Sequence, residues 1–340
     1  MTYTVTVIAI VLFSFILLST DRPTLSHARF TGRWATHDKE MVTINSGSYF
    51  EIEVKGSSVR LYFDIRGLTD LPQLTFQIDD NNPTYHSIAS GRVTLTIPND
   101  GQFHRIRVAV KAVNEHQRNW IHLEGAVKYV GITADGELRE SPQPRKPLIE
   151  FLGDSITAGI HLHHQGTETD RMDGPLAYPS LVGQALHLPY VQDGFGRLGL
   201  LVTGNGEVPI AIQSLGYCFQ GARWKTKPNL VVINLGTNDA SQPDSKFQPA
   251  YVAYLQAVRK LYPHAMIICL EPFGGFHAGA IQAAVNVFRN DGDRRVEYID
   301  TAGWLPKSDT TDGLHPSATG HRLIAEHLIP IIQSLLSKED

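Results

Sequence analysis

The chain has 340 residues, too many for one small domain and enough for two domains of ordinary size. Apolar residues make up 42% of it and charged residues 19%, with no low-complexity tract, which is the composition of a folded globular protein. The formal net charge is −4, and Lys and Arg are scattered along the chain, so no nucleic-acid partner is expected.

The first 28 residues are typical of a secretory signal peptide. An almost unbroken apolar run extends from Val5 to Leu18, and about fourteen residues fit a signal-peptide core better than a membrane span, which needs about twenty. Small residues at Ser26 and Ala28 predict cleavage after Ala28. No Lys or Arg precedes the run, so an uncleaved membrane anchor is the alternative. A cleaved chain is expected to be secreted, without stable membrane association.

The next segment, residues 29–136, alternates between apolar and polar residues and is interrupted by turn residues. Alternation of this kind predicts short antiparallel strands. Several such strands without helices favour an all-β sandwich, in particular a jelly roll. The expected strands lie at 49–54, 59–65, 74–78, 93–97 and 104–110.

Residues 137–147 are polar and rich in proline, which is typical of an interdomain linker. From residue 148 to residue 340 the pattern changes to alternating buried strands and amphipathic helices. That alternation predicts an α/β domain with a doubly wound parallel sheet and helices on both faces. Strands are expected at 148–152, 190–192, 230–235, 266–270 and 296–299. Helices are expected at 249–261, at 280–288 and from about Pro316 onward. Pro330 lies late in the last helix, where a proline is expected to kink or split it.

The chain has two cysteines, Cys218 and Cys269. Cys269 lies in the apolar strand predicted at 266–270, where a buried free thiol is the expected state. A disulfide between the two remains an alternative in an oxidising compartment.

Three polar clusters follow predicted strands or precede a predicted helix. The strand at 148–152 runs into Gly153-Asp154-Ser155, which brings a serine hydroxyl to the carboxyl end of a parallel sheet, where such sheets bind ligands. Serine becomes a strong nucleophile only when a base removes its proton, and His315 is the candidate base. Asp312, three residues earlier, can hold the imidazole in the required tautomer. The alternative for Ser155 is a helix N-cap.

These clusters resemble the SGNH (GDSL-type) hydrolases over residues 147–338. The matching motifs are Gly-Asp-Ser at 153–155, Gly-Thr-Asn-Asp at 236–239, Asp-x-x-His at 312–315 and the glycine motif at 193–197. A second resemblance covers the whole arrangement. The chain resembles the family-two carbohydrate esterases in the order of its segments, which are Arg29 to Trp34, a β domain, a linker and Gly-Asp-Ser. Members of that family have a jelly-roll domain and remove acetyl groups from plant-type polysaccharides.

The resemblance implies three donors for the oxyanion of the tetrahedral intermediate, namely the backbone N–H of Ser155, the backbone N–H of Gly196 and the side-chain amide of Asn238. Gly194 is the alternative to Gly196, and a purely structural turn is the alternative to both. Asn238 has the alternative of a turn-forming residue. Asp154 and Asp239 are expected to fix loops through backbone N–H groups.

Two other motifs have the residue types of a metal site. His161-Leu162-His163-His164 has no Cys, Asp or Glu at a recognised spacing, and a loop at the mouth of the substrate site is the expected role. Asp291-Gly292-Asp293 lacks the further ligands of a calcium loop. Serine chemistry needs no metal, so neither a metal nor another cofactor is predicted.

The sequence therefore predicts a secreted two-domain serine esterase that removes small acyl groups, above all acetyl groups, from a polysaccharide. Its activity should require neutral His315 and so fall as the pH drops. A short-chain lipase or general esterase is one alternative, although no long apolar lid segment is visible. A catalytically inactive carbohydrate-binding surface protein is the other, against which the intact Ser155, Asn238 and His315 argue.

Overall fold

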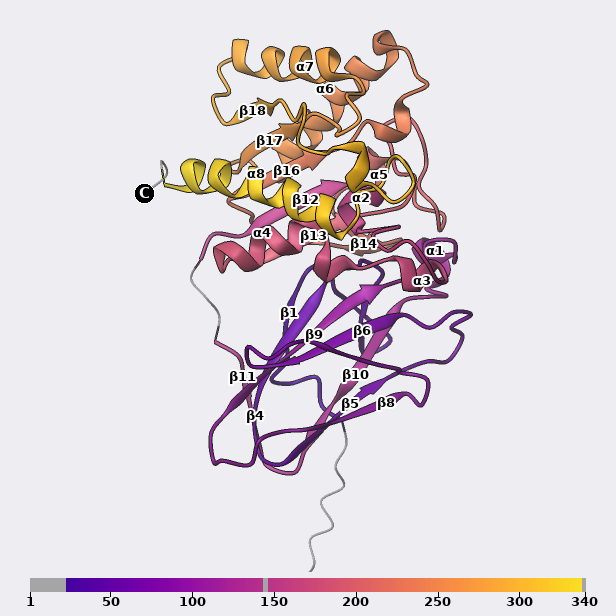
Figure 1. Cartoon of the computed structure of the whole chain (residues 1–340), viewed down its shortest axis with the longest axis vertical. Coiled ribbons are helices and arrows are strands. Elements are labelled where there is room, and N and C mark those ends of the chain that lie inside the picture. Colours follow the sequence, from indigo (N-terminus) through magenta and orange to yellow (C-terminus); the bar gives the residue numbers. More distant parts are fainter. Residues whose placement is uncertain (1–22, 143–145, 338–340) are drawn as a thin grey trace, which may run out of the picture.

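A computed structural model describes residues 23–142 and 146–337 of the chain. It has two parts, an all-β part formed by the first half of the sequence and an α/β part formed by the second (Figure 1). The predicted fold class is confirmed, with antiparallel sheets followed by a parallel five-stranded sheet and its helices. The parts meet along a broad contact, so residues of the first lie against the second.

Two antiparallel sheets make up the β part. One has the strand order β1-β4-β9-β6-β7, with β11 paired to β4 along the same edge as β1, and the second has the order β2-β3-β10-β5-β8. The strands of the first sheet are β1 (Arg29–Thr31), β4 (Tyr49–Lys55), β6 (Gln73–Ile78), β7 (Thr84–His86), β9 (His104–Ala112) and β11 (Glu137–Glu140). Those of the second are β2 (Ala35–His37), β3 (Glu40–Thr43), β5 (Ser58–Phe63), β8 (Arg92–Thr96) and β10 (Val127–Ala134).

The core between these sheets is built from alternate residues of each strand. Phe50, Ile52 and Val54 of β4 are buried and face the interior, where they meet residues such as Leu61 and Val108. This alternation is what a sheet with one buried face requires. The period-two pattern in the sequence thus places the sandwich core correctly.

The predicted linker begins later than expected, because its first four residues form β11. This strand pairs antiparallel with β4, and Leu138 packs against the sandwich core. Glu137 pairs with Lys55, and Arg139 with Glu53, across the two strands. Cross-strand contacts of this kind stabilise a strand at the sheet edge. The polar composition of the same segment, taken alone, predicts a loop.

The α/β part contains a parallel sheet with the strand order β13-β12-β16-β17-β18. Its strands are β12 (Ile149–Gly153), β13 (Tyr190–Gly194), β16 (Leu230–Asn234), β17 (Met266–Leu270) and β18 (Val296–Ile299), close to the predicted segments. After β12 the chain forms β13 on one side of it, and then β16 on its other side. Open sheets of this type bind ligands at the carboxyl ends of the strands where the order of strands switches direction.

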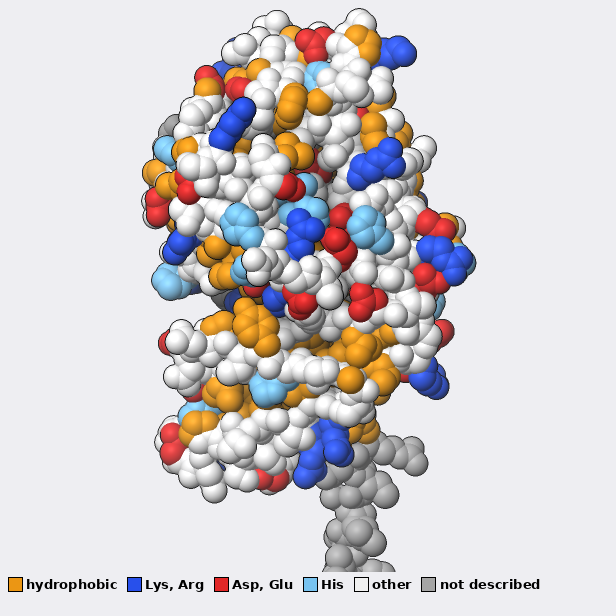
Figure 2. Space-filling model, turned by 45° about the vertical axis from the view of Figure 1, so that its right-hand side comes forward, with side chains coloured by type: hydrophobic (Ala, Val, Ile, Leu, Met, Phe, Trp, Pro, Cys, Tyr) orange, Lys and Arg blue, Asp and Glu red, His pale blue; other side chains and the backbone are white. Residues whose placement is uncertain are grey.

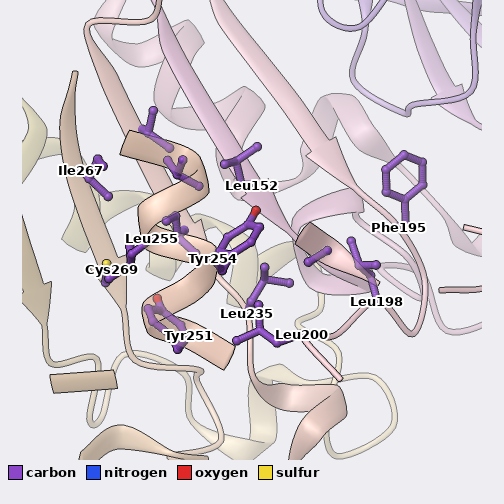
Figure 3. Packing of buried hydrophobic residues seen from close by; sticks show 14 of the residues in the cluster. Leu152, Phe195, Leu198, Leu200, Leu235, Tyr251, Tyr254, Leu255, Ile267 and Cys269 are labelled. Atoms are coloured by element: carbon purple, nitrogen blue, oxygen red, sulfur yellow. The ribbon is translucent and has the colours of Figure 1, made fainter. Parts of the chain in front are cut away.

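Helices cover both faces of this sheet. Helices α4 (Tyr178–Leu186) and α8 (Ala318–Leu336) pack on one face, and α6 (Asp244–Leu261) and α7 (Ala278–Asn290) pack on the other. In Figure 3, Tyr254 and Leu255 of α6 lie between the helix and the strands that carry Leu152 and Ile267. The shorter elements are α1 (Asn119–His122), α2 (Ser155–Ala158), α3 (Glu168–Arg171), α5 (Ala211–Ser214), β14 (Tyr217–Phe219), β15 (Ala222–Arg223) and the 3₁₀ turns η1 (Gly174–Leu176), η2 (Thr237–Asp239) and η3 (Lys307–Asp309).

Two helix predictions were wrong in detail. Helix α6 begins at Asp244 rather than at Pro249, because the buried ring of Phe247 stacks on His277 at 3.9 Å between centroids and fixes the first turns. Helix α8 begins at Ala318 with Ser317 as its N-cap and continues through Pro330 without a break.

A buried group of charges connects the two parts. Arg33, in the loop between β1 and β2, is fully buried, and its guanidinium lies 2.8 Å from a Glu150 oxygen and 2.9 Å from an Asp193 oxygen. It also donates to the backbone carbonyl of Tyr217 at 2.7 Å, while Asn45 donates to Asp193 at 3.2 Å. Charges this deep are stable only when they are paired and hydrogen-bonded.

A second connection runs from β9 to the segment around α3. The ammonium of Lys111 donates to the backbone carbonyls of Thr169, at 2.8 Å, and Met172, at 2.7 Å. Gln73 of β6 donates to Asp170 at 2.8 Å. The α3 segment is therefore attached to the β part by side chains of two different strands.

Most of the predicted signal peptide, residues 1–22, lies outside the described residues. Thr24, within the remaining stretch, forms two backbone hydrogen bonds with Ile132 of β10, at 3.2 and 3.0 Å. None of the helices in residues 23–142 and 146–337 has both the length and the apolar character of a membrane span. Cys218 and Cys269 are both buried and free, so the disulfide alternative is wrong.

Candidate active site

Ser155 follows the carboxyl end of β12, the second strand of the parallel sheet, where the chain turns into α2. Gly153 is needed there, because a Cβ at this position would stand 2.0 Å from the Thr157 hydroxyl. Asp154, not Ser155, is the N-cap of α2, and its side chain accepts the Ile156 N–H at 3.0 Å. Ser155 is the first helical residue, so its hydroxyl is not used as a cap.

The imidazole of His315 faces the hydroxyl of Ser155. The distance between His315 Nε2 and Ser155 Oγ is 2.9 Å, and the distance between His315 Nδ1 and Asp312 Oδ2 is 2.7 Å. The other oxygen of Asp312 accepts the backbone N–H groups of Leu314 and His315 at 3.0 and 2.8 Å. Hydroxyl, imidazole and carboxylate therefore stand in a row, within hydrogen-bonding distance of one another.

The carboxyl group of Asp312 is held in its ionised form. Its partial burial opposes ionisation, but the His315 backbone N–H and the rings of His315 and His161 outweigh this and hold the pKa of Asp312 well below its usual range. An ionised carboxylate at this position fixes the tautomer of His315 with the proton on Nδ1, which leaves Nε2 free to accept a proton from the serine.

Asn238 lies in η2, which follows β16, the strand beside β12. Its amide nitrogen donates to the Leu198 carbonyl at 3.0 Å and contacts the Asp154 carboxyl at 3.3 Å. The neighbouring Asp239 accepts the backbone N–H groups of Leu200 and Leu201 at 2.8 and 2.9 Å. Asp154 and Asp239 thus bind loop backbone, as the sequence predicts.

Asp154 is buried below this arrangement. Burial raises its pKa to about 7, with the nearby Asp239 adding to the effect against the hydrogen bonds from the backbone. Its carboxyl group touches both the first turn of α2 and the amide of Asn238. It connects the loop that carries the serine with the loop that carries the asparagine.

The two candidate glycines follow β13 and differ in their surroundings. A Cβ at Gly194 would stand 2.6 Å from the Ala158 nitrogen, so the absence of a side chain lets β13 approach α2 closely. A Cβ at Gly196 would overlap the carboxyl group of Glu115, which comes from the β part. Close packing therefore accounts for glycine at both positions.

The histidine-rich segment after α2 lies beside the row formed by Ser155, His315 and Asp312. His161 Nδ1 stands 3.2 Å from Asp312 Oδ2, and His161 Nε2 stands 3.2 Å from Glu168 Oε2. The rings of His161 and His315 meet edge to face, with their centroids 4.9 Å apart. Figure 2 shows histidine side chains gathered with acidic ones in the middle of one face of the α/β part.

Two groups of potential metal ligands occur among the described residues. The donor atoms of His161, Asp312 and His315 lie within 4.8 Å of one another, as do those of Glu115, His116 and Glu168. In the first group the facing atoms are already paired as hydrogen-bond donors and acceptors. We therefore assign it to the hydrogen-bond network around His315.

Sequence reasoning missed the contacts of His161 with Asp312 and Glu168, and the approach of Glu115 to Gly196. His161 and Asp312 are separated by 151 positions in the chain, and no motif connects them. Glu115 follows β9 in the β part, in a loop that carries no catalytic motif. These contacts depend on how the two parts pack and leave no local pattern.

Comparison with known proteins gives a family for the α/β part. Residues 151–323 match the model of the GDSL-like Lipase/Acylhydrolase family. This range covers half of the chain and includes the serine, the asparagine and the histidine described above.

Two curated proteins are similar in sequence. The chain is 29% identical over 238 residues to the cellulase/esterase CelE of Acetivibrio thermocellus, an alignment that covers 62% of this chain and 28% of that protein. It is 26% identical over 318 residues to an acetylxylan esterase/glucomannan deacetylase of Cellvibrio japonicus, covering 84% of this chain and 83% of the other. The chain thus spans less than a third of CelE and most of the second relative.

Solved structures extend the likeness to both parts of the fold. A family two carbohydrate esterase from Cellvibrio japonicus superimposes with a TM-score of 0.77 at 20% identity, over 94% of this chain and 97% of that chain. One from Clostridium thermocellum, in complex with cellohexaose, superimposes with a TM-score of 0.76 at 23% identity, over 91% and 99% of the two chains. The combination of β part and α/β part is therefore shared with these structures.

Proposed function

The chain belongs to the GDSL-like lipase/acylhydrolase family, and on that premise we propose that it is a serine esterase which removes small acyl groups, above all acetyl groups, from a polysaccharide. The observation that carries the proposal is the 2.9 Å contact between His315 Nε2 and Ser155 Oγ, with Asp312 behind the imidazole. The names of the relatives support the substrate class, since one of them is an acetylxylan esterase/glucomannan deacetylase.

The proposed reaction has two stages. His315 takes the proton of Ser155 as its Oγ attacks the acyl carbonyl carbon, and the same proton then passes to the departing sugar oxygen as the ester bond breaks. A water molecule attacks the acyl-serine in the same way, and releases the carboxylic acid and the free hydroxyl. Asp312 stabilises the imidazolium that forms in each stage.

The negative oxygen of each tetrahedral intermediate needs donors that are already in place. We assign this role to the backbone N–H groups of Ser155 and Gly196 and to the amide of Asn238. The 3.0 Å bond from Asn238 to the Leu198 carbonyl uses one N–H and fixes the plane of the amide. The second N–H has only the longer 3.3 Å contact with Asp154, which an oxyanion can replace as its acceptor.

Export of the protein fits this function, because insoluble polysaccharides lie outside the cell. The apolar run from Val5 to Leu18 supports a signal peptide. A cleavage after Ala28 would remove Thr24 and its two hydrogen bonds to Ile132. Cleavage after Ala28 stays a prediction, which N-terminal sequencing of the exported protein tests.

Hydrolysis of p-nitrophenyl acetate by the wild type and by Ser155→Ala tests the enzyme proposal. We expect the variant to lose at least about a thousandfold in kcat, because the nucleophile is gone. Ser245→Ala, on the exposed first turn of α6, is the matched control and should keep full activity. Equal rates for wild type and Ser155→Ala would leave the inactive carbohydrate-binding protein as the better explanation.

Two substrate series then separate the remaining alternatives. A chain-length series from acetyl to palmitoyl esters should show a steep fall beyond short acyl groups, whereas rising rates would favour a lipase. Acetate release from acetylated xylan, glucomannan and chitin, measured side by side, identifies the polymer. No release from any of the three would contradict the proposed substrate class.

A further inference from the structure

His161 has an unusual position between two carboxylates. Its Nδ1 faces Asp312 Oδ2 and its Nε2 faces Glu168 Oε2, each at 3.2 Å, and about a fifth of its side chain is exposed. An ionised carboxylate accepts hydrogen bonds and cannot donate them. A neutral imidazole has a single N–H and can donate to only one of the two. Both contacts are satisfied together only when His161 carries a proton on each nitrogen.

Asp312 Oδ2 is therefore shared by two rings. It accepts from His315 at 2.7 Å and from His161 at 3.2 Å, and the two rings meet edge to face. The shared oxygen is fixed from two directions, so its position relative to His315 does not depend on the loop backbone alone. A protonated His161 also places a positive charge beside the base, and that charge opposes the protonation of His315.

We infer that His161 is a positioning residue for the proposed reaction: it fixes Asp312 against His315 and keeps the base unprotonated at lower pH. The inference rests on the roles proposed above for Ser155 and His315. It assigns a function to the first histidine of the 161–164 segment, for which the sequence predicts only a place at the mouth of the site.

The side chain of His161 can be changed without removing the backbone contacts around it. The His161 carbonyl accepts the Thr311 hydroxyl at 2.6 Å, and its φ of 54° puts the residue in the left-handed region. Glu168 is on α3, whose segment Lys111 attaches to the β part. Truncation of the imidazole should therefore leave both supporting loops in place.

The other charged groups near His161 are few. His315 and Asp312 face it from the loop before α8, and Glu168 faces it from α3. Beyond Glu168 lie Arg171, 3.8 Å away on the same helix, and the pair Glu115 and His116 from the β part. The positive charge of Arg171 weakens the electrostatic attraction between Glu168 and a protonated His161, whereas the negative charge of Glu115 strengthens the attraction for a positive charge there. Asp312 and Glu168 are thus the two carboxyl groups in direct contact with His161.

His161→Ala and His161→Gln test the inference, with His264→Gln, an exposed histidine in the loop between α6 and β17, as the matched control. With p-nitrophenyl acetate, we expect His161→Ala to lower kcat about tenfold with little change in KM. His161→Gln should recover part of the loss, because its amide N–H can still donate to Asp312. His264→Gln should behave as wild type.

The pH profile provides the readout that a merely structural role would not change. In both His161 variants the acid limb of kcat/KM should move to higher pH by about one unit, because a nearby positive charge is lost. Glu168→Gln, which leaves the imidazole in place, should move the limb in the same direction by a smaller amount. Glu168→Gln therefore still tests the inference through the pH profile if His161→Ala does not fold.

The outcomes separate this inference from the proposed function. If Ser155→Ala abolishes activity while the His161 and Glu168 variants keep the kcat and pH profile of wild type, the inference is wrong and the esterase stands. If wild type and Ser155→Ala hydrolyse the ester equally, the proposed function itself fails. A lower kcat in His161→Ala with an unshifted acid limb and a lowered Tm would mean that His161 serves folding only.

Discussion

Replacement of Arg33 by methionine is the sharpest test of how the two parts are held together. The guanidinium is fully buried and neutralises Glu150 and Asp193, which belong to two neighbouring strands of the parallel sheet. Methionine has a similar length but no charge, so the variant keeps much of the packing and leaves two carboxylates without a cation. Removal of one partner from a buried ion pair typically costs about 3–5 kcal/mol of stability.

The loss of stability caused by Arg33→Met should depend on pH. Burial already raises the pKa of Asp193 to about 6, although Arg33 opposes this rise. Without Arg33 the pKa of Asp193 should rise further, so the folded variant binds a proton that the unfolded chain releases. Its stability is then retained at low pH and lost as the pH rises, by up to about 1.4 kcal/mol per pH unit for each carboxyl that folds protonated.

Urea unfolding of wild type and Arg33→Met at pH 5, 6, 7 and 8 measures this dependence. The difference between the two proteins should be about 3–5 kcal/mol at pH 7 and clearly smaller at pH 5. Arg66→Met removes an arginine whose side chain is 86% exposed beside Asp64, and should cost far less stability than Arg33→Met at every pH. A cost for Arg33→Met that does not vary with pH would refute the view that its charge neutralises the two carboxyls.

Two further predictions concern the oxyanion site and the packing of the sheet. Asn238→Ala should lower kcat on p-nitrophenyl acetate about 10²–10³-fold with a small change in KM, because one donor to the oxyanion is lost; a loss below about threefold would assign Asn238 to loop structure alone. Gly183→Ala should lower the free energy of unfolding by about 1–3 kcal/mol, since the new Cβ would stand 2.1 Å from the ring of Tyr190. Gly279→Ala, in an exposed helical position with free space around it, should instead stabilise by about 0.5–1 kcal/mol, and an equal loss in both variants would contradict the packing argument.

The parallel sheet was predictable because its strands are buried on both faces. Runs such as 230–235 and 266–270 are almost entirely apolar, and no other element of that length has this composition in an α/β fold. The chain order of the serine, asparagine and histidine motifs then indicated which strand ends meet. The family membership that these motifs suggested is confirmed by the match over residues 151–323.

The contacts that the sequence did not predict are long-range and polar. The segment 137–140 was assigned to a linker because its residues are charged, yet those charges pair across to β4. His161 was expected at the mouth of the site, but its partner Asp312 lies 151 positions away. Such pairings follow from the way segments are brought together in space, and composition and periodicity do not record them.

The attachment of the α3 segment to the β part has a consequence for how this architecture can be rearranged. The ammonium of Lys111, in β9, donates hydrogen bonds to two backbone carbonyls in the segment that carries Glu168. The α/β part expressed alone would expose these carbonyls and lose the anchor of a loop next to His161 and His315. The two halves are therefore not interchangeable modules joined by a tether, and shuffling either one with a foreign partner requires transplanting this lysine together with the backbone it holds.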